Sequence, residues 1–213
     1  MASEITLAPD ETVAGRPFAD PAHTRREEEA LRRLLDYERK RARVWTEDPF
    51  KDRKDVLSRE IDPEGRRHLL VVPDTRALLE AENPTVVGFF GRPRADADTA
   101  VLFELEEELI AGMSAYAPGG LLSYYDVELV KGAYGNLILF AGTEGPVNWR
   151  DNALHRKAVD ISPWSYHEIR LHLGSLAGRL LDDGTLRLKR TRYLDFNDPE
   201  DVWRAVRWLS ERD

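Results

Sequence analysis

The strongest constraint on the fold is the order in which hydrophobic periodicity changes between residues 85 and 173. Residues 85–90 are rich in β-branched and aromatic side chains and end at Gly91, which is typical of a strand. Apolar residues then recur at helical spacing over 98–116 and again over 147–161. The remaining segments alternate as strands do; they are 121–130, 134–141 and 166–173. The sequence therefore predicts the order strand, helix, strand, strand, helix, strand.

This order is the split βαβ arrangement of ferredoxin-like domains, in which an antiparallel four-stranded sheet carries both helices on one face. We therefore expect an α+β fold with a ferredoxin-like βαββαβ core over residues 85–173. Because a monomer rarely exposes a large apolar face, we expect a homodimer that covers the other face of the sheet. That face would carry a share of Tyr124, Val127, Leu129, Leu137 and Leu139.

The flanking segments are expected to be extensions of this core. Residues 1–19 mix acidic residues, Gly and Pro without a period, which predicts a mobile tail. Residues 20–84 would form an N-terminal helical extension, because Asp20 and Pro21 supply an N-cap and a first helical residue; residues 68–72 could add a strand. Residues 174–213 would form a hairpin around Asp183-Gly184 and a final helix after Asn197, both packed on the core.

Composition excludes several classes of function. The net charge of −8, from 39 acidic and 31 basic residues, disfavours nucleic acid and anionic membranes as partners. The absence of cysteine excludes disulfides, thiolate metal ligands and a cysteine nucleophile. The first residues lack a secretory pattern, and no apolar run approaches the roughly 18 residues of a membrane helix. We therefore expect a cytoplasmic protein.

One part of the predicted core resembles a known family. The strand that begins near Asn136 passes through an acidic turn at Glu144 into a helix with Trp149 and, six positions later, His155. In this arrangement residues 85–173 resemble the dimeric α/β-barrel superfamily, and within it the antibiotic-biosynthesis-monooxygenase-like group. The resemblance implies that two chains pair their sheets into a barrel, with a pocket between each sheet and its helices. Members include cofactor-independent monooxygenases of polycyclic phenols and haem-degrading enzymes.

The resemblance and the residue chemistry together indicate candidate site residues. A base is expected among His155, His167 and His172, because imidazole titrates near neutral pH. Aromatic residues would shape the substrate cavity, namely Trp149, Tyr124 and Tyr166. We expect a monooxygenase-like oxidoreductase, without cofactor or metal, in which an electron-rich small molecule is deprotonated and reacts with dioxygen. His167 and His172 would not share a metal, because their odd spacing on a strand sends them to opposite faces.

Two other functions stay open at this point. One of the same histidines would be the axial ligand in a haem-binding or haem-processing protein. Against this, the ligand position of the haem-degrading branch falls at Ala158 and Val159. The other alternative is a non-catalytic dimer that binds a protein through its charged terminal helices. A basic group in the C-terminal region would either bind an anionic ligand or offset the acidic balance; it consists of Arg187, Lys189, Arg190 and Arg192.

Overall fold

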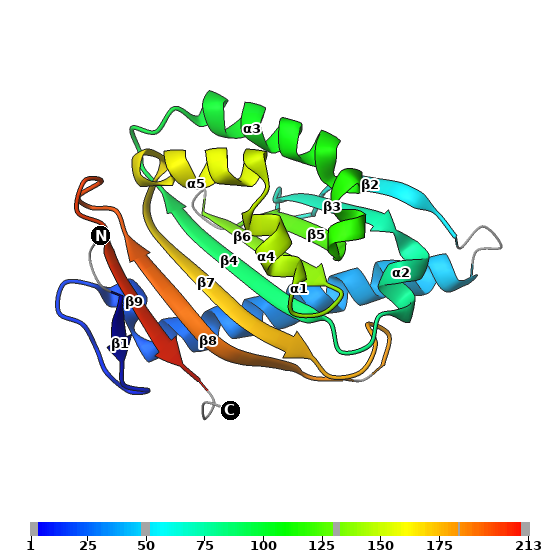
Figure 1. Ribbon diagram of the computed structural model, residues 1–213, viewed down its shortest axis with the longest axis horizontal. Coiled ribbons are helices and arrows are strands. Elements are labelled where there is room, and N and C mark those ends of the chain that lie inside the picture. Colours follow the sequence, from blue (N-terminus) through cyan, green and yellow to red (C-terminus); the bar gives the residue numbers. More distant parts are fainter. Residues whose placement is uncertain (1–3, 48–51, 130–132, 183, 210–213) are drawn as a thin grey trace.

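The computed structural model describes residues 4–47, 52–129, 133–182 and 184–209, and within them nine strands form one sheet (Figure 1). The strands are β1 (Ile5–Leu7), β2 (Lys54–Ile61), β3 (Arg67–Asp74), β4 (Thr85–Pro93), β5 (Leu121–Glu128), β6 (Tyr134–Phe140), β7 (Tyr166–Leu176), β8 (Leu186–Asp195) and β9 (Trp203–Trp208). The helices are α1 (Pro21–Glu47), α2 (Thr75–Glu80), α3 (Thr99–Gly112), α4 (Gly145–Arg150) and α5 (Ala153–Ser165), with 3-10 helices η1 (Pro17–Ala19) and η2 (Met113–Gly119). None of these helices combines the length and apolar character needed to cross a membrane.

The sheet is larger and more varied than the predicted one. Its strand order is β1-β9-β8-β7-β4-β6-β5-β3-β2. Every neighbouring pair is antiparallel except β1 and β9, which are parallel. The predicted four-stranded antiparallel ferredoxin-like sheet is therefore wrong. The strands expected within residues 85–173 are β7, β4, β6 and β5, and they form only the middle of a nine-stranded mixed sheet.

Helices cover the two faces of the sheet unequally (Figure 1). On one face the long helix α1 lies across the strands, and its Leu31, Leu34 and Leu35 join a core with Leu78 of α2 and with residues of the strands from β3 to β7. On the other face α3, η2 and α4 close a second core, in which Leu109 and Met113 pack on Leu69 of β3 and on Phe140 of β6.

The helix α1 occupies the sheet face that was assigned to a second chain. Val127, Leu137 and Leu139 are buried in the same core as the leucines of α1. Tyr124 is not on this face, since it packs with the other core. Because one chain covers its own sheet, the predicted dimeric α/β barrel is wrong, and the homodimer stays a prediction without its original support.

The closeness of α1 to the sheet explains a glycine in the central strand β4. A Cβ atom built on Gly88 would lie 2.6 Å from a methyl carbon of Leu31. Any larger residue would therefore displace Leu31 from the core.

The ends of the chain were assigned incorrectly. Part of the predicted mobile tail forms β1 and η1, and residues 1–3 of that tail lie outside the described residues. The predicted last helix is the strand β9 instead, in which Arg207 is completely buried. Its guanidinium donates to the carbonyl oxygens of Ala8, Glu11 and Ala19, so the charge is satisfied by the N-terminal segment. A buried arginine interrupts the alternation of apolar and polar residues from which strands are predicted.

Several central elements follow the prediction more closely. The strand expected at residues 68–72 is β3, and the helix beginning at Asp20-Pro21 is α1, whose Ala22 N–H donates to Asp20 Oδ1 at 2.7 Å. The helix expected over 147–161 is split into α4 and α5, because Asn152 caps a new helix. The polar strand β2 was missed. The turns expected at 131–133 and 183–184 fall largely outside the described residues.

One polar residue in the α1 core is unusual. Glu38 is completely buried, and neither carboxyl oxygen has a hydrogen-bond partner among the described residues. Burial raises the pKa of Glu38 to about 7, and the nearby Ser123 hydroxyl offsets this only in part. In the folded protein this carboxyl is therefore protonated at acidic pH, and its ionisation above neutrality destabilises the fold.

We predict that Glu38→Gln changes how stability depends on pH. In the wild type the carboxyl loses its proton in the unfolded state near its ordinary pKa of 4.5, but in the folded state only near 7. The wild type should therefore lose stability as pH rises through this window, by about 3 kcal/mol, whereas Glu38→Gln should not. Urea unfolding over a pH series measures the difference, with exposed Glu29→Gln on the same helix as control. Parallel curves for wild type and Glu38→Gln would contradict the prediction.

Candidate functional site

The face of the sheet below α4 and α5 carries a cluster of aromatic rings centred on Trp149. The Trp149 ring centroid lies 5.4 Å from that of Tyr116, 6.2 Å from that of Tyr124 and 6.4 Å from that of Phe140. The imidazole of His155 adjoins it on another side, with ring centroids 5.6 Å apart. The first turn of α5 and the middle of β5 thus meet at one tryptophan.

A hydrogen-bonded group continues from this ring cluster along the sheet. Asn136 of β6 donates through Nδ2 to the hydroxyl oxygen of Tyr124 at 2.7 Å and to Oδ1 of Asp126 at 2.8 Å. Tyr124 and Asp126 are two residues apart on β5 and therefore point to the same face. The Tyr124 oxygen accepts from Asn136, so its own proton is free to be donated elsewhere.

Asp126 is the group in this cluster whose carboxyl gains or loses its proton near neutral pH. Burial raises the pKa of Asp126 to about 7, and the negative charge of Glu106 adds to the effect. Arg67 opposes it from 3.5 Å, but the same guanidinium is also 3.0 Å from Glu106. Burial likewise raises the pKa of Tyr124, with the charge of Asp126 next in importance. Asp126 thus provides a buried acid that is neutral below pH 7.

The N-terminal turn of α5 holds two polar atoms without partners. Asn152 accepts the N–H groups of Leu154 and His155 through Oδ1, and so fixes the start of the helix beside Trp149. The Asn152 Nδ2 and the His155 Nδ1 are buried without a hydrogen-bond partner among the described residues. Unpaired buried polar atoms are rare in folded proteins, and a ligand or a water could complete the bonding of these two.

Burial lowers the pKa of His155; a hydrogen bond to the Arg150 backbone opposes this lowering, and the charge of Arg150 adds to it. The imidazole is therefore neutral at neutral pH, and it has an unpartnered nitrogen. A neutral imidazole with a free nitrogen is a competent proton acceptor.

Tyr166 borders the same face from the start of β7. Its ring packs edge-on against Phe89 at 5.7 Å between centroids. The close approach to β4 requires Gly91, where a Cβ atom would lie 2.6 Å from the Tyr166 ring. Burial raises the pKa of Tyr166, and Asp126 contributes the next largest effect, which places the two groups near one another.

The helices do not seal this face. Val87, Phe89 and Leu171 lie on the central strands β4 and β7 and yet remain partly exposed, as do Tyr124 and Tyr166. Antiparallel strands such as these can face water on one side of a sheet. Solvent therefore reaches the rings that border Asp126.

The structure brings together three of the six predicted site residues, His155, Trp149 and Tyr124. Tyr166 packs instead against Phe89. His172 is on the opposite face, completely buried. It contacts Thr191 at 2.8 Å through Nδ1 and Glu27 at 2.9 Å through Nε2. Both of its nitrogens are thus engaged, so neither is free in this structure to act as a base or as an axial ligand. His167 is partly exposed near the start of β7, and its backbone carbonyl accepts the Phe196 N–H.

Sequence reasoning missed Asp126, Asn136 and Asn152 as site residues. Asp126 and Asn136 are polar residues within strongly apolar strands, and both are buried. A polar residue at an inward position of a strand was the available signal. No group of three or more His, Asp or Glu side chains suited to a metal is found within the described ranges.

We predict that the His172 group is structural. Burial alone would raise the pKa of Glu27, but His172, His23 and the charge of Arg170 together lower it far below its usual range. Because Arg170 and Glu27 form a buried ion pair at 2.6 Å, Glu27→Ala should cost about 3–5 kcal/mol of unfolding free energy. Glu28→Ala removes a partly exposed pair with Arg32 and should cost below about 1 kcal/mol. Chemical denaturation compares the two; equal losses would contradict the assignment.

Comparison of the chain with protein-family models, curated proteins and solved structures finds no match, so the site is interpreted from its own chemistry.

Proposed function

We propose that this protein is a small-molecule enzyme that forms and stabilises a phenolate or enolate anion on the sheet face below α4 and α5. The observation that carries this proposal is the pair of unpartnered buried atoms, Asn152 Nδ2 and His155 Nδ1, beside the Trp149 ring. They lie next to two side chains that can donate hydrogen bonds, the hydroxyl of Tyr124 and the protonated carboxyl of Asp126. An aromatic or enolic substrate would bond to the two unpartnered atoms on one side and to Tyr124 and Asp126 on the other.

His155 would remove the substrate proton. Its pKa is lowered by burial, so the imidazole is neutral and ready to accept a proton without first losing one. The ring stands against Trp149, which limits its rotation and holds it in one orientation. The Asn152 amide would orient a substrate oxygen near the base.

Tyr124 and the protonated Asp126 would stabilise the resulting anion. A neutral carboxylic acid kept protonated by a buried environment donates a strong hydrogen bond to an oxyanion, as does a tyrosine hydroxyl. Asn136 holds both groups in place through its two N–H bonds. The aromatic rings around Trp149 would favour a planar substrate.

Reaction of this anion with dioxygen is the narrower prediction, and it follows the resemblance to monooxygenases. The deprotonation step is common to that reaction and to a simple proton transfer. The two are separated by whether oxygen is consumed.

We predict that the protein binds a dinitrophenolate in a pH-dependent way. This probe stays ionised across the range, so only the protein titrates. Its affinity should fall as pH rises through about 7, by up to about tenfold per unit, because Asp126 ionises and repels the anion. Asp126→Asn should abolish the decrease. The control is Glu38→Gln, which removes a buried carboxyl on the opposite face whose pKa is also about 7. This substitution should leave the decrease in affinity unchanged. Equal pH profiles for Asp126→Asn and wild type, measured by absorbance titration, would overturn the assignment of Asp126.

We predict that His155→Ala slows oxygen consumption with electron-rich phenols. Loss of a general base lowers turnover by about 10²- to 10⁴-fold. An oxygen electrode measures the rate, and circular dichroism checks that the melting temperature is retained. His23→Ala is the matched control, since His23 is on α1 at the opposite face. If wild type binds the phenolate but consumes no oxygen, the monooxygenase prediction fails while the anion-stabilising function stands.

A further inference from the structure

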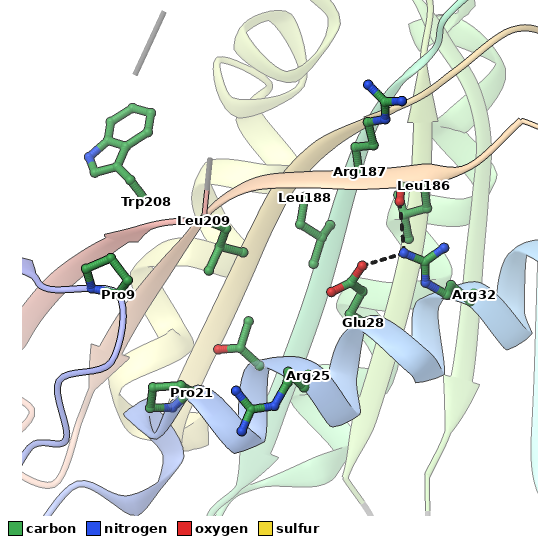
Figure 2. Close-up of a pocket in the computed structure, with 11 residues that line it drawn as sticks. Pro9, Pro21, Arg25, Glu28, Arg32, Leu186, Arg187, Leu188, Trp208 and Leu209 are labelled. Carbon is green, nitrogen blue, oxygen red and sulfur yellow. Dashed lines mark hydrogen bonds and ion pairs between the residues drawn. The ribbon is translucent and has the colours of Figure 1, made fainter. Parts of the chain in front are cut away.

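A pocket of about 530 Å³ lies on the opposite side of the molecule from the site described above (Figure 2). It is formed between the first turns of α1 and the strands β8 and β9. The lining residues are Pro9, Pro21, Thr24, Arg25, Glu28, Arg32, Leu186, Arg187, Leu188, Trp208 and Leu209. Its volume falls within the range of about 300–1,000 Å³ that is usual for small-molecule sites.

Much of the pocket wall is apolar and comes from distant parts of the chain. Pro9 and Pro21 contribute from the N-terminal segment, and Leu188 and Leu209 from the C-terminal strands. In Figure 2 Leu188 and Leu209 point down toward α1, whereas Arg187 and Trp208 point up from the strands. The hydroxyl of Thr24 is already bonded to Tyr193 at 2.9 Å, so it adds no free polar group.

Two arginines of the lining have no counterion among the described residues, Arg25 and Arg187, and Arg187 points away from α1 (Figure 2). Arg32 donates through Nη2 to Glu28 at 2.5 Å and to the Leu186 carbonyl at 3.1 Å. Those two charges therefore compensate one another. Arg25 is on the same helix at the opening of the pocket and has no ion-pair or hydrogen-bond partner among the described residues. Arg25 is exposed, so its guanidinium is accessible to an anionic group beside the apolar wall.

We propose that this pocket binds an amphipathic monocarboxylate, with its carboxylate on Arg25 and its hydrocarbon part against Leu188 and Leu209. The planar guanidinium matches a carboxylate through two parallel N–H bonds. A single negative charge fits, because Glu28 stands close by and would repel a second one. This binding is independent of the anion-forming site, since α1 and the sheet separate the two.

Calorimetric titration with octanoate tests the proposal. The wild type should bind octanoate saturably at one site, and Arg25→Ala should weaken binding by at least about tenfold, as expected for lost hydrogen bonds to a charged group. Arg33→Ala removes an exposed arginine of α1 that does not line the pocket, and should have no effect. Leu209→Glu should also weaken binding, because it introduces a charge into the apolar wall.

Several results would overturn the proposal. These are octylammonium binding as tightly as octanoate, equal effects of Arg25→Ala and Arg33→Ala, or no saturable binding. A change in oligomeric state on titration, seen by light scattering, would make the pocket a contact between copies.

Discussion

The burial of α1 against the sheet is the interaction on which the rest of the structure depends. A nine-stranded sheet has two apolar faces, and each needs cover to be stable. The leucines of α1 supply that cover along one whole face, from Leu31 against Gly88 to Trp45 near the end of the helix. This leaves the shorter helices α3, α4 and α5 for the other face, where Tyr124 and Tyr166 remain partly exposed.

Three buried carboxyl groups show how the surroundings decide protonation. Glu27 and Glu38 lie about three turns apart on α1 and are both buried. Glu27 meets Arg170 and His172, and its pKa is lowered, whereas Glu38 meets no charged partner, and its pKa is raised. Asp126 on the other face resembles Glu38 in pKa, but its neighbours are Asn136 and Tyr124. We expect the first group to stabilise the fold and the second to cost stability, and we propose that the third stabilises a bound anion.

The strand β5 connects these environments. Its alternation turns Tyr125 toward α1 and turns Tyr124 and Asp126 toward the opposite face. The Tyr125 hydroxyl contacts His68 at 2.6 Å, so the polar group on the α1 side is satisfied internally. The sheet thus separates a structural polar network from the group that we propose as reactive. Substitutions on the two sides should accordingly affect stability and activity differently.

The sequence by itself determined the local elements. Asp20-Pro21 determined the start of α1, the apolar run after His68 determined β3, and the spacing of Trp149 and His155 brought these side chains together. These features depend on neighbours within one or two turns. Only the tertiary structure decided the sheet size, the burial of Arg207 in β9 and the role of Asp126. Each of these depends on segments far apart in the chain, because charge satisfaction and face coverage are properties of packed elements rather than of local pattern.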